Sequence, residues 1–366
     1  MTKNFLYISK NAFIKRDMGG REFLSKNNFH NLKKIYNKNF YYFKLGNNKI
    51  RKLISFIKSF FGNIDGINNK SLIKIEKLIK LKKINIVYFD GSNLGKCVKF
   101  IKQKFPNIKL IIYFHNIESK FFFDSMIIKK TVKSFFIMLV NYLAEKKSIK
   151  YGDKLLVLTN NDSKIMQRIY KRKADVIIPL SIKLKKIKES KIQFAKKKFL
   201  LFVGGNFYGN LDGIRWFVKN VLPFINCNLI IVGKGYLKSD FFFKKKIYLA
   251  GRVKNLDKFY NKSFATIAPI FSGSGMKTKV AESLMYGKKI FGTNEAFIGY
   301  ENLKKYNNIV VECNNSKEFI YFINKTLKQK KIKLFNNKAR VLFKNFYSPE
   351  LNNKIFSTFL IKNKFI

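Results

Sequence analysis

The 366-residue sequence is poor in the residue types from which several kinds of site are built. Its three cysteines are far apart and odd in number, which argues against a disulfide framework and favours a reducing compartment. Only two histidines are present, His30 and His115, so a histidine-based zinc site has almost no ligands. Five prolines, beside 47% hydrophobic and 16% aromatic residues, exclude a collagen-like or disordered chain and predict a sizeable packed core.

Acidic residues are also scarce, since 21 Asp and Glu stand against 75 Lys and Arg, for a net charge of +54. Nucleic-acid-binding proteins gather basic residues in a stripe or a recognised motif, whereas the lysines here are spread through nearly every segment. Asn, Ile, Phe and Tyr are spread in the same way, and all of these residues have A- and T-rich codons. We therefore favour genomic base composition as the origin of the charge, with attraction to anionic lipid or polyphosphate surfaces as the alternative.

Two kinds of membrane-related segment are missing. Residues 1–9 are a short apolar pattern that runs into Lys10 and Arg16 without a small-residue cleavage site, so no cleavable signal peptide is visible. No stretch has the roughly 18 apolar residues of a membrane span. The nearest, residues 134–144, has lysines on both sides. It is interpreted as a buried helix of a first domain, or as a helix on an anionic membrane surface.

Short apolar runs alternate with helical patterns along the chain, which indicates parallel sheets covered on both faces. Strands are expected at residues 5–9, 40–45, 84–89, 109–115, 154–158, 175–178, 199–204, 228–233, 247–250, 264–269, 289–293 and 309–312. Helices are expected at residues 20–36, 71–82, 94–104, 127–149, 161–170, 211–222, 256–261, 276–286, 316–329 and 333–345. Asp162 is expected to be the N-cap of its helix.

This order predicts an α/β chain with two doubly wound, Rossmann-like domains. The first is expected over residues 1–180, followed by a lysine-rich linker at 181–198 and the second domain at 199–346. The tail, residues 347–366, is expected to be a helix that crosses back to the first domain. Open α/β sheets bind ligands beyond the carboxyl ends of their strands, so two such domains facing a cleft would place the site there.

The most informative motif lies in residues 268–292, where a strand is followed by the loop Ser272-Gly273-Ser274-Gly275 and a helix that opens at Met276. Glycines let the backbone approach a ligand, and free N–H groups at a helix N-terminus attract anions. Lys277 and Lys279 add cations in the first turn, where the helix dipole favours acids, so a bound anion would explain them. The alternative is a glycine-rich turn with two solvated lysines.

The stretch GSGMKTKVAESLMYGK, residues 273–288, resembles the nucleotide-sugar motif of glycosyltransferase family 4 and related group 1 enzymes of the GT-B fold. Residues 202–223 resemble the start of the C-terminal domain of that family, and Gly251-Arg252-Val253 resembles its next turn. Residues 17–21 are similar to the glycine turn that opens the N-terminal domain, and residues 113–118 to a strand-end histidine motif. The resemblance covers residues 5–345.

The resemblance implies roles for individual residues. Glu282 would bind the ribose hydroxyls of the donor, since one carboxylate can accept from two O–H groups. His115 would face the donor sugar near the reacting carbon, although a histidine at a strand end is also a common core residue. The other implied donor-binding residues are the loop Ser274, Gly275 and Met276, the turns Gly19-Gly20 and Gly205-Asn206, and the bases Arg252, Lys277 and Lys279.

Two positions depart from the family pattern. Many relatives have a glutamate where this chain has Ser274, and many have Arg and Lys just after the first strand of the C-terminal domain. Here that stretch begins Gly205-Asn206 and has no base, so the diphosphate charge must be neutralised elsewhere. Lys277, Lys279, Lys234 and Arg252 remain open for this role.

The resemblance implies a hexosyl- or related glycosyltransferase that moves a sugar from a nucleotide diphosphate to a hydroxyl of a glycan or lipid-linked acceptor, in cell-surface polysaccharide or glycolipid synthesis. It also implies retention of configuration and, with no Asp-x-Asp pair in the sequence, no metal; no cofactor and no nucleic acid are expected. The alternatives are a catalytically degenerate sugar-nucleotide- or glycan-binding protein, and a nucleotide-sugar epimerase of the same fold. A cytoplasmic location is expected, with attachment to the inner face of the cytoplasmic membrane left open.

Overall fold

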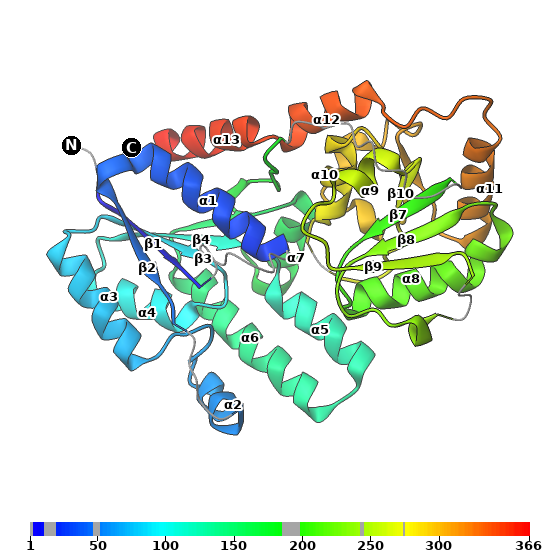
Figure 1. Ribbon diagram of the computed structural model, residues 1–366. Coiled ribbons are helices and arrows are strands. Elements are labelled where there is room, and N and C mark those ends of the chain that lie inside the picture. Colours follow the sequence, from blue (N-terminus) through cyan, green and yellow to red (C-terminus); the bar gives the residue numbers. More distant parts are fainter. Residues whose placement is uncertain (1–2, 11–19, 47–51, 185–197, 242–244, 274) are drawn as a thin grey trace. The chain divides into compact units, whose positions relative to one another are not determined.

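The computed structural model describes the chain except for residues 1–2, 11–19, 47–51, 185–197, 242–244 and 274 (Figure 1). It divides into two compact units, Met1–Leu180 together with Asn352–Ile366, and Ser181–Leu351. Each unit contains one six-stranded sheet in which every pair of neighbouring strands is parallel. The expected α/β class with two doubly wound sheets is therefore confirmed.

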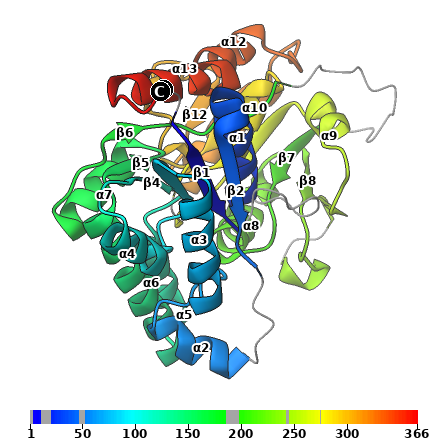
Figure 2. The same ribbon diagram turned by 90° about the vertical axis from the view of Figure 1, so that its left-hand side faces the viewer.

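The sheet of the N-terminal unit has the order β2-β1-β3-β4-β5-β6 (Figure 2). Its strands are β1 (Phe5–Ser9), β2 (Phe40–Lys44), β3 (Ile86–Asp90), β4 (Lys109–Phe114), β5 (Lys154–Val157) and β6 (Val176–Ile177). Its helices are α1 (Gly20–Tyr36), α2 (Lys52–Phe60), α3 (Asn69–Leu81), α4 (Gly95–Lys104), α5 (Glu118–Lys129), α6 (Val132–Tyr151), α7 (Asn160–Tyr170) and α13 (Pro349–Lys362). Strands β1 and β3 are buried along their whole length, as expected for central strands covered on both faces.

The sheet of the C-terminal unit has the order β12-β11-β10-β7-β8-β9. Its strands are β7 (Phe199–Val203), β8 (Asn228–Val232), β9 (Ile247–Gly251), β10 (Ala265–Ala268), β11 (Lys289–Gly292) and β12 (Val310–Glu312). Its helices are α8 (Tyr208–Asn220), α9 (Asp257–Lys262), α10 (Thr278–Met285), α11 (Ser316–Leu327) and α12 (Asn337–Tyr347).

Each sheet has one point where the direction of winding reverses. It lies between β1 and β3 in the N-terminal unit and between β7 and β10 in the C-terminal unit. The two strands at each point are neighbours in the sheet but not consecutive in sequence, because the chain adds its later strands on the other side of the first one. At such a point the loops that follow the two strands diverge to opposite faces of the sheet and leave a crevice at the carboxyl ends. The two reversal points therefore mark where each unit is expected to bind a ligand.

All twelve expected strands form, with ends that differ by at most two residues. The single helix expected at residues 127–149 is wrong, because α5 and α6 form a hairpin there. Lys130 has a positive φ of 48°, and the side chain of Thr131 caps α6 by accepting a hydrogen bond from the backbone N–H of Ser134. The N-cap expected at Asp162 is also wrong, since Thr159 caps α7 and donates its hydroxyl hydrogen to Asp162.

The apolar stretch at residues 134–144 lies within α6 and is buried only in part. Val140 and Ala144 are buried, whereas Phe135 and Leu143 are 46% and 40% exposed. Among the described helices, none combines the length and apolar character needed to cross a bilayer. The three cysteines, Cys97, Cys227 and Cys313, are buried and form no disulfide, as is usual for core thiols.

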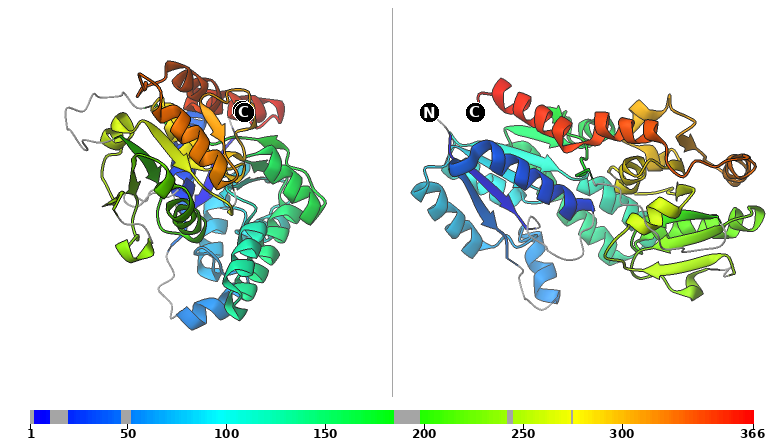
Figure 3. Two further views of the ribbon diagram at one scale, coloured as in Figure 1. Left: turned by 90° about the vertical axis from the view of Figure 1, so that its right-hand side faces the viewer. Right: turned by 45° about the horizontal axis from the view of Figure 1, so that its top comes forward.

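Helix α13 contributes to the core of the N-terminal unit, beside α1 (Figure 3). Its residue Asn352 donates a hydrogen bond to the carbonyl oxygen of Pro179 at 2.9 Å and accepts one from the amide of Asn31 at 3.3 Å. Phe356 and Leu360 are each only 1% exposed. The last residues of the chain are thus packed against its first half.

Candidate functional site

Two segments predicted to bind the donor meet at the reversal point of the C-terminal sheet. The turn Gly204-Gly205-Asn206 follows β7, and the loop that leads into α10 follows the neighbouring strand β10. Helix α8 packs so closely against this loop that a Cβ atom at Gly213 would lie 1.7 Å from the carbonyl oxygen of Pro269. Only glycine fits there, which explains in physical terms why the segment Asn210-Leu211-Asp212-Gly213 ends in glycine.

The side chain of Lys279 enters this site from α10 and is buried. Its Nζ donates a hydrogen bond to Oδ1 of Asn210 at 2.7 Å and lies 4.2 Å from the ring centre of Phe202. A Cβ atom on Gly204 would be 3.2 Å from the same Nζ, so the ammonium lies against the turn after β7. Burial, with a smaller contribution from Lys277, lowers the pKa of Lys279 to about 7.

The other three bases considered for the diphosphate are placed differently. The Lys277 ammonium is 3.2 Å from a carboxylate oxygen of Glu295 and donates to the carbonyl oxygen of Gly275 at 3.0 Å, so its charge is already paired. Lys234 and Arg252 are exposed. Of the four, Lys279 is therefore the one buried against the turn where relatives often carry a base.

Glu282 is half-buried on α10, one helical turn beyond Lys279. One of its oxygens accepts a hydrogen bond from the hydroxyl of Tyr260 at 3.1 Å. Tyr260 stacks face to face on Tyr286, with ring centres 4.3 Å apart, and the Tyr286 hydroxyl donates to Asp257. The hydrogen bond from Tyr260, whose ring is held by stacking on Tyr286, thus restrains the carboxylate of Glu282.

The remaining predicted residues of this unit lie in turns. Gly205 and Asn206 are exposed, and the Asn206 amide donates to the carbonyl oxygen of Gly235 at 2.6 Å, which joins the turns after β7 and β8. Gly275 has a positive φ of 68°, and Met276 is buried in the loop two residues before α10. Ser274 and Gly19 lie outside the described residues, and Gly20 is the first residue of α1.

His115 follows β4 in the N-terminal unit and is paired with Asp90, the last residue of β3. Its Nε2 is 3.1 Å from Oδ1 of Asp90, and both side chains are buried. Burial alone would raise the pKa of Asp90, but His115 and Arg21 hold it below its usual value. An ionised carboxylate only accepts hydrogen bonds, so Nε2 of His115 carries the hydrogen that is donated to Asp90, while the other ring nitrogen, Nδ1, is buried and has no hydrogen-bond partner among the described residues.

A second charged group lies at the same sheet edge. The Arg21 guanidinium is 3.2 Å from Asp65 and 3.7 Å from Glu118. Burial raises the pKa of Glu118 to about 7, with Arg21 opposing the rise and Glu145 and Asp65 adding to it. A carboxyl group with this pKa can exchange a proton near neutral pH.

Sequence reasoning did not select these four residues, Arg21, Asp65, Asp90 and Glu118, as site residues. Asp90 had a usable signal, because it ends a buried strand next to the strand that His115 follows. Glu118 lies in the same motif as His115. Asp65 follows an irregular segment and gives no sequence signal. Within the part of the chain that the structure describes, no group of three or more His, Cys, Asp or Glu side chains has metal-binding geometry.

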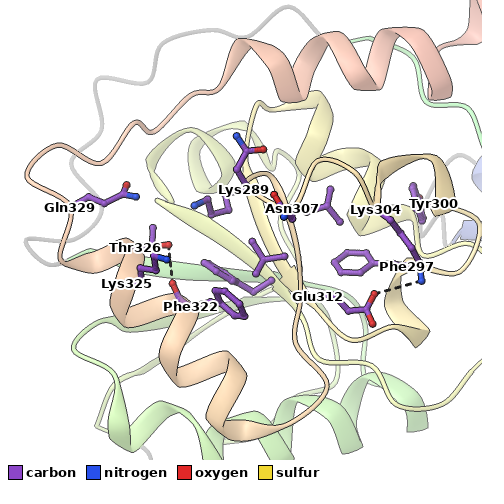
Figure 4. Close-up of a pocket in the computed structure, with 14 residues that line it drawn as sticks. Lys289, Phe297, Tyr300, Lys304, Asn307, Glu312, Phe322, Lys325, Thr326 and Gln329 are labelled. Atoms are coloured by element: carbon purple, nitrogen blue, oxygen red, sulfur yellow. Dashed lines mark hydrogen bonds and ion pairs between the residues drawn. The ribbon is translucent and has the colours of Figure 1, made fainter.

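A pocket of about 470 Å³ lies elsewhere in the C-terminal unit, between the β11–β12 edge and α11 (Figure 4). Phe297 and Phe322 line it together with Lys289 and Lys325, and an ion pair of 3.8 Å between Lys304 and Glu312 closes one side. None of the predicted donor-binding residues lines this pocket.

Residues 197–329 match the family model of the glycosyl transferases group 1. This part of the chain is a group 1 glycosyltransferase domain. The turn after β7, Lys279 and Glu282 all lie within this glycosyltransferase domain, whereas Gly19, Gly20 and His115 lie outside the matched residues. No curated protein sequence matches the chain significantly.

Several solved structures share the fold of the whole chain. Sucrose-phosphate synthase from Thermosynechococcus elongatus is 11% identical, with a TM-score of 0.75 and coverage of 98% of both chains. Anabaena HepE, solved in complex with UDP-glucose, is 10% identical, with a TM-score of 0.67 and coverage of 98% of this chain and 99% of its own. A glycosyltransferase from Rickettsia africae is 14% identical, with a TM-score of 0.63 and coverage of 100% and 98%. The group 1 glycosyltransferase domain is thus part of a GT-B fold.

Proposed function

We propose that this protein transfers a sugar from a nucleotide diphosphate donor to a hydroxyl group of a glycan or lipid-linked acceptor. The observation that carries the proposal is the position of Lys279, buried beside the turn after β7 at the reversal point of the group 1 glycosyltransferase domain. A buried lysine at the carboxyl ends of the strands is suited to an anionic ligand. Anabaena HepE, which shares the fold, was solved with UDP and with UDP-glucose.

The donor is proposed to lie along α10 and the turns beside it. Lys279 would pair with the diphosphate, and the backbone N–H groups at the start of α10 would donate to its oxygens. Glu282, held by Tyr260, would accept hydrogen bonds from the ribose hydroxyls one turn further along. In this arrangement the donor would also contact the backbone of Gly205, Asn206, Gly275 and Met276. Lys277 and Arg252 would lie at the rim of the donor site.

In the proposed reaction the bond between the sugar and the diphosphate breaks, and negative charge develops on the leaving oxygen. Lys279 and the helix N–H groups are fixed before the reaction begins, so they stabilise that charge without rearrangement. The family resemblance implies retention of configuration and no divalent metal. His115, oriented by Asp90, is proposed to contact the donor sugar through its free Nδ1 side.

The acceptor and the pathway are the finer part of the proposal. We propose a hexosyl or related transfer in the synthesis of a cell-surface polysaccharide or glycolipid. The buried, unpaired cysteines suit a cytoplasmic location, and Lys129, Lys130 and Lys133 suit electrostatic attraction to the inner face of the cytoplasmic membrane.

A second candidate function is epimerisation of a nucleotide sugar. Glu118, with its pKa near 7, and the Asp90–His115 pair favour it, because epimerisation needs acid and base groups at the sugar. A degenerate protein that binds the donor without turnover is the third reading, prompted by Ser274 in place of a glutamate.

Two measurements test the proposal in order. Thermal unfolding of the full chain is first followed with a panel of nucleotide diphosphate sugars, since a ligand that binds only the folded protein raises its melting temperature. We expect one donor to stabilise the wild type and to lose most of this effect with Lys279→Met. Products from that donor, labelled in its sugar, then distinguish transfer, epimerisation and binding without turnover. If no nucleotide diphosphate stabilises the wild type, the proposed donor site is wrong.

A further inference from the structure

The hairpin of α5 and α6 exposes large apolar side chains that the donor site does not use. Phe123 and Ile127 on α5 are 43% and 51% exposed, and Val132 and Phe135 on α6 are 76% and 46% exposed. On α5 they are four residues apart and on α6 three apart, so each pair lies on one face of its helix. A surface helix is expected to be polar on its outer face, and this hairpin is apolar there as well.

Helix α2 extends the same apolar surface. Ile57 and Phe61, on α2 and in the turn after it, are 52% and 71% exposed. The ring centres of Phe56 and Phe60 lie 6.3 and 5.6 Å from that of Phe136 on α6, so α2 is held against the hairpin. Figures 1 and 2 show α2 beside α6 in both views. We call the exposed apolar residues of α2, its following turn and the α5–α6 hairpin the basic apolar patch.

The charges around the basic apolar patch are positive. Lys58, Lys129, Lys130 and Lys133 are exposed, as are Lys146 and Lys150 further along α6. The acidic side chains on these helices do not offset them at the surface. Glu118 and Glu145 are buried, and Asp124 is paired with Lys120 at 2.6 Å.

The apolar side chains and lysines of the basic apolar patch favour one kind of binding partner over another. A second copy of the chain would bring two like-charged surfaces together, which costs affinity. An anionic bilayer offers headgroup phosphates for the lysines and acyl chains for the apolar side chains at the depths where each is needed. Exposed apolar patches rimmed by polar residues mark interaction sites of this kind.

We propose that the basic apolar patch docks the N-terminal unit on an anionic lipid bilayer, with its apolar side chains inserted between the lipids and its lysines at the headgroups. The proposal goes beyond the sugar-transfer reaction and does not depend on it. It also differs from electrostatic attraction alone, because inserted apolar side chains add affinity that salt does not screen.

Binding of the full chain to vesicles, without nucleotide, tests the proposal. Vesicles of phosphatidylglycerol and phosphatidylcholine are sedimented at about 0.1 M and about 1 M salt, where the screening lengths are about 10 and 3 Å. We expect the wild type to bind at low salt and to keep a measurable part of that binding at high salt. Replacing Lys129, Lys130 and Lys133 with Gln should weaken the low-salt binding and leave the salt-resistant part.

The apolar variant Phe61→Ser/Ile127→Ser/Val132→Ser should lose the binding that persists at high salt. Its affinity for the vesicles should fall by about tenfold for each apolar side chain removed. Its matched control is Leu237→Ser/Tyr321→Ser, which changes two equally exposed apolar residues (64% and 58%) of the C-terminal unit and should bind like the wild type. In a separate Val132→Trp variant, brominated acyl chains should quench the added fluorescence, since the natural Trp216 lies in the other unit.

Three outcomes would overturn the proposal. The first is a wild type that ignores anionic vesicles at low salt, and the second is an apolar variant that binds like the wild type. The third is evidence that protein, not lipid, covers the patch. Light scattering would then show a dimer for the wild type and a monomer for the apolar variant, or the apolar variant would have a much lower melting temperature than the wild type.

Discussion

The Lys279 ammonium is buried against Phe202 and the turn after β7, and burial lowers its pKa to about 7. A diphosphate at this position would raise that pKa again, because a nearby anion favours the charged lysine. Binding would then take up a proton at any pH between the two pKa values. The affinity for a nucleotide diphosphate sugar should therefore be highest below pH 7 and fall as the pH rises, by up to about tenfold per pH unit.

Calorimetric titration in buffers of different ionisation enthalpy measures both the affinity and the proton uptake. Lys279→Met should bind more weakly and show a flat pH dependence over the same range. A slope that persists in this variant would assign the titration to another group. The stability of the ligand-free protein should depend on pH in the opposite direction. Above pH 7 the unfolded chain binds more protons at Lys279 than the folded chain does, so the free energy of unfolding should rise with pH.

Glu282 gives a second prediction at this scale. Glu282→Ala should weaken binding of the donor and of the free nucleotide diphosphate together, by about 1.5–3 kcal/mol, the usual worth of hydrogen bonds to a charged group. Tyr260→Phe is the control, because it removes the hydrogen bond to Glu282 and keeps the carboxylate. Equal nucleotide affinity in wild type and a folded Glu282→Ala protein would remove the ribose role.

The sequence supported the candidate residues of the glycosyltransferase domain because they lie in one continuous motif. It left open which base meets the diphosphate, since the choice depends on burial and on the approach of α10 to the turn after β7. Asp65 and Arg21 could not be paired from the sequence, because they are 44 residues apart, with most of α1 and the whole of β2 and α2 between them. Contacts of that range depend on the packing of loops.

At the scale of elements, the contact between α8 and the loop after β10 gives a third prediction. Gly213→Ala would place a Cβ atom 1.7 Å from a backbone oxygen that cannot rotate away, so the helix or the loop must shift. The free energy of unfolding should fall by about 3 kcal/mol, at the upper end for overpacked sites. Chemical denaturation measures this change.

Gly205→Ala is the matched control for stability, because nothing lies within 4 Å of a Cβ atom there. It should leave the free energy of unfolding within about 0.5 kcal/mol of the wild type, as most changes at open surface positions do. A Gly213→Ala protein as stable as this control would contradict the close contact.

The strands could be predicted well because each is a short, continuous apolar run bounded by polar residues. The helices α2 and α5 were missed for different reasons. Helix α2 spans only nine residues, too few for its period to stand out. Helices α5 and α6 are apolar on several faces, which hid the break between them, although Thr131 and Ser134 form a capping box there.

At the scale of the whole molecule, the proposed reaction gives a prediction about metals. Activity should survive excess chelator, because the sequence has no Asp-x-Asp pair and the described residues contain no cluster of metal ligands. The measurement is turnover of the identified donor before and after EDTA treatment. Complete loss that Mg²⁺ or Mn²⁺ restores would contradict the proposed mechanism, whereas donor binding would still be judged by its own test.

The division into two units also affects how the chain is made. Ribosomes release the N-terminal strands first, yet the N-terminal unit includes Asn352–Ile366, which emerge only after the C-terminal unit. Until then the surfaces against which Phe356 and Leu360 pack are exposed, and the carbonyl oxygen of Pro179 lacks the hydrogen bond from the side-chain amide of Asn352. A chain without Asn352–Ile366 would therefore leave the part that is synthesised first incomplete and exposed to chaperones and proteases. The N-terminal unit can thus be completed only after the C-terminal unit has been synthesised.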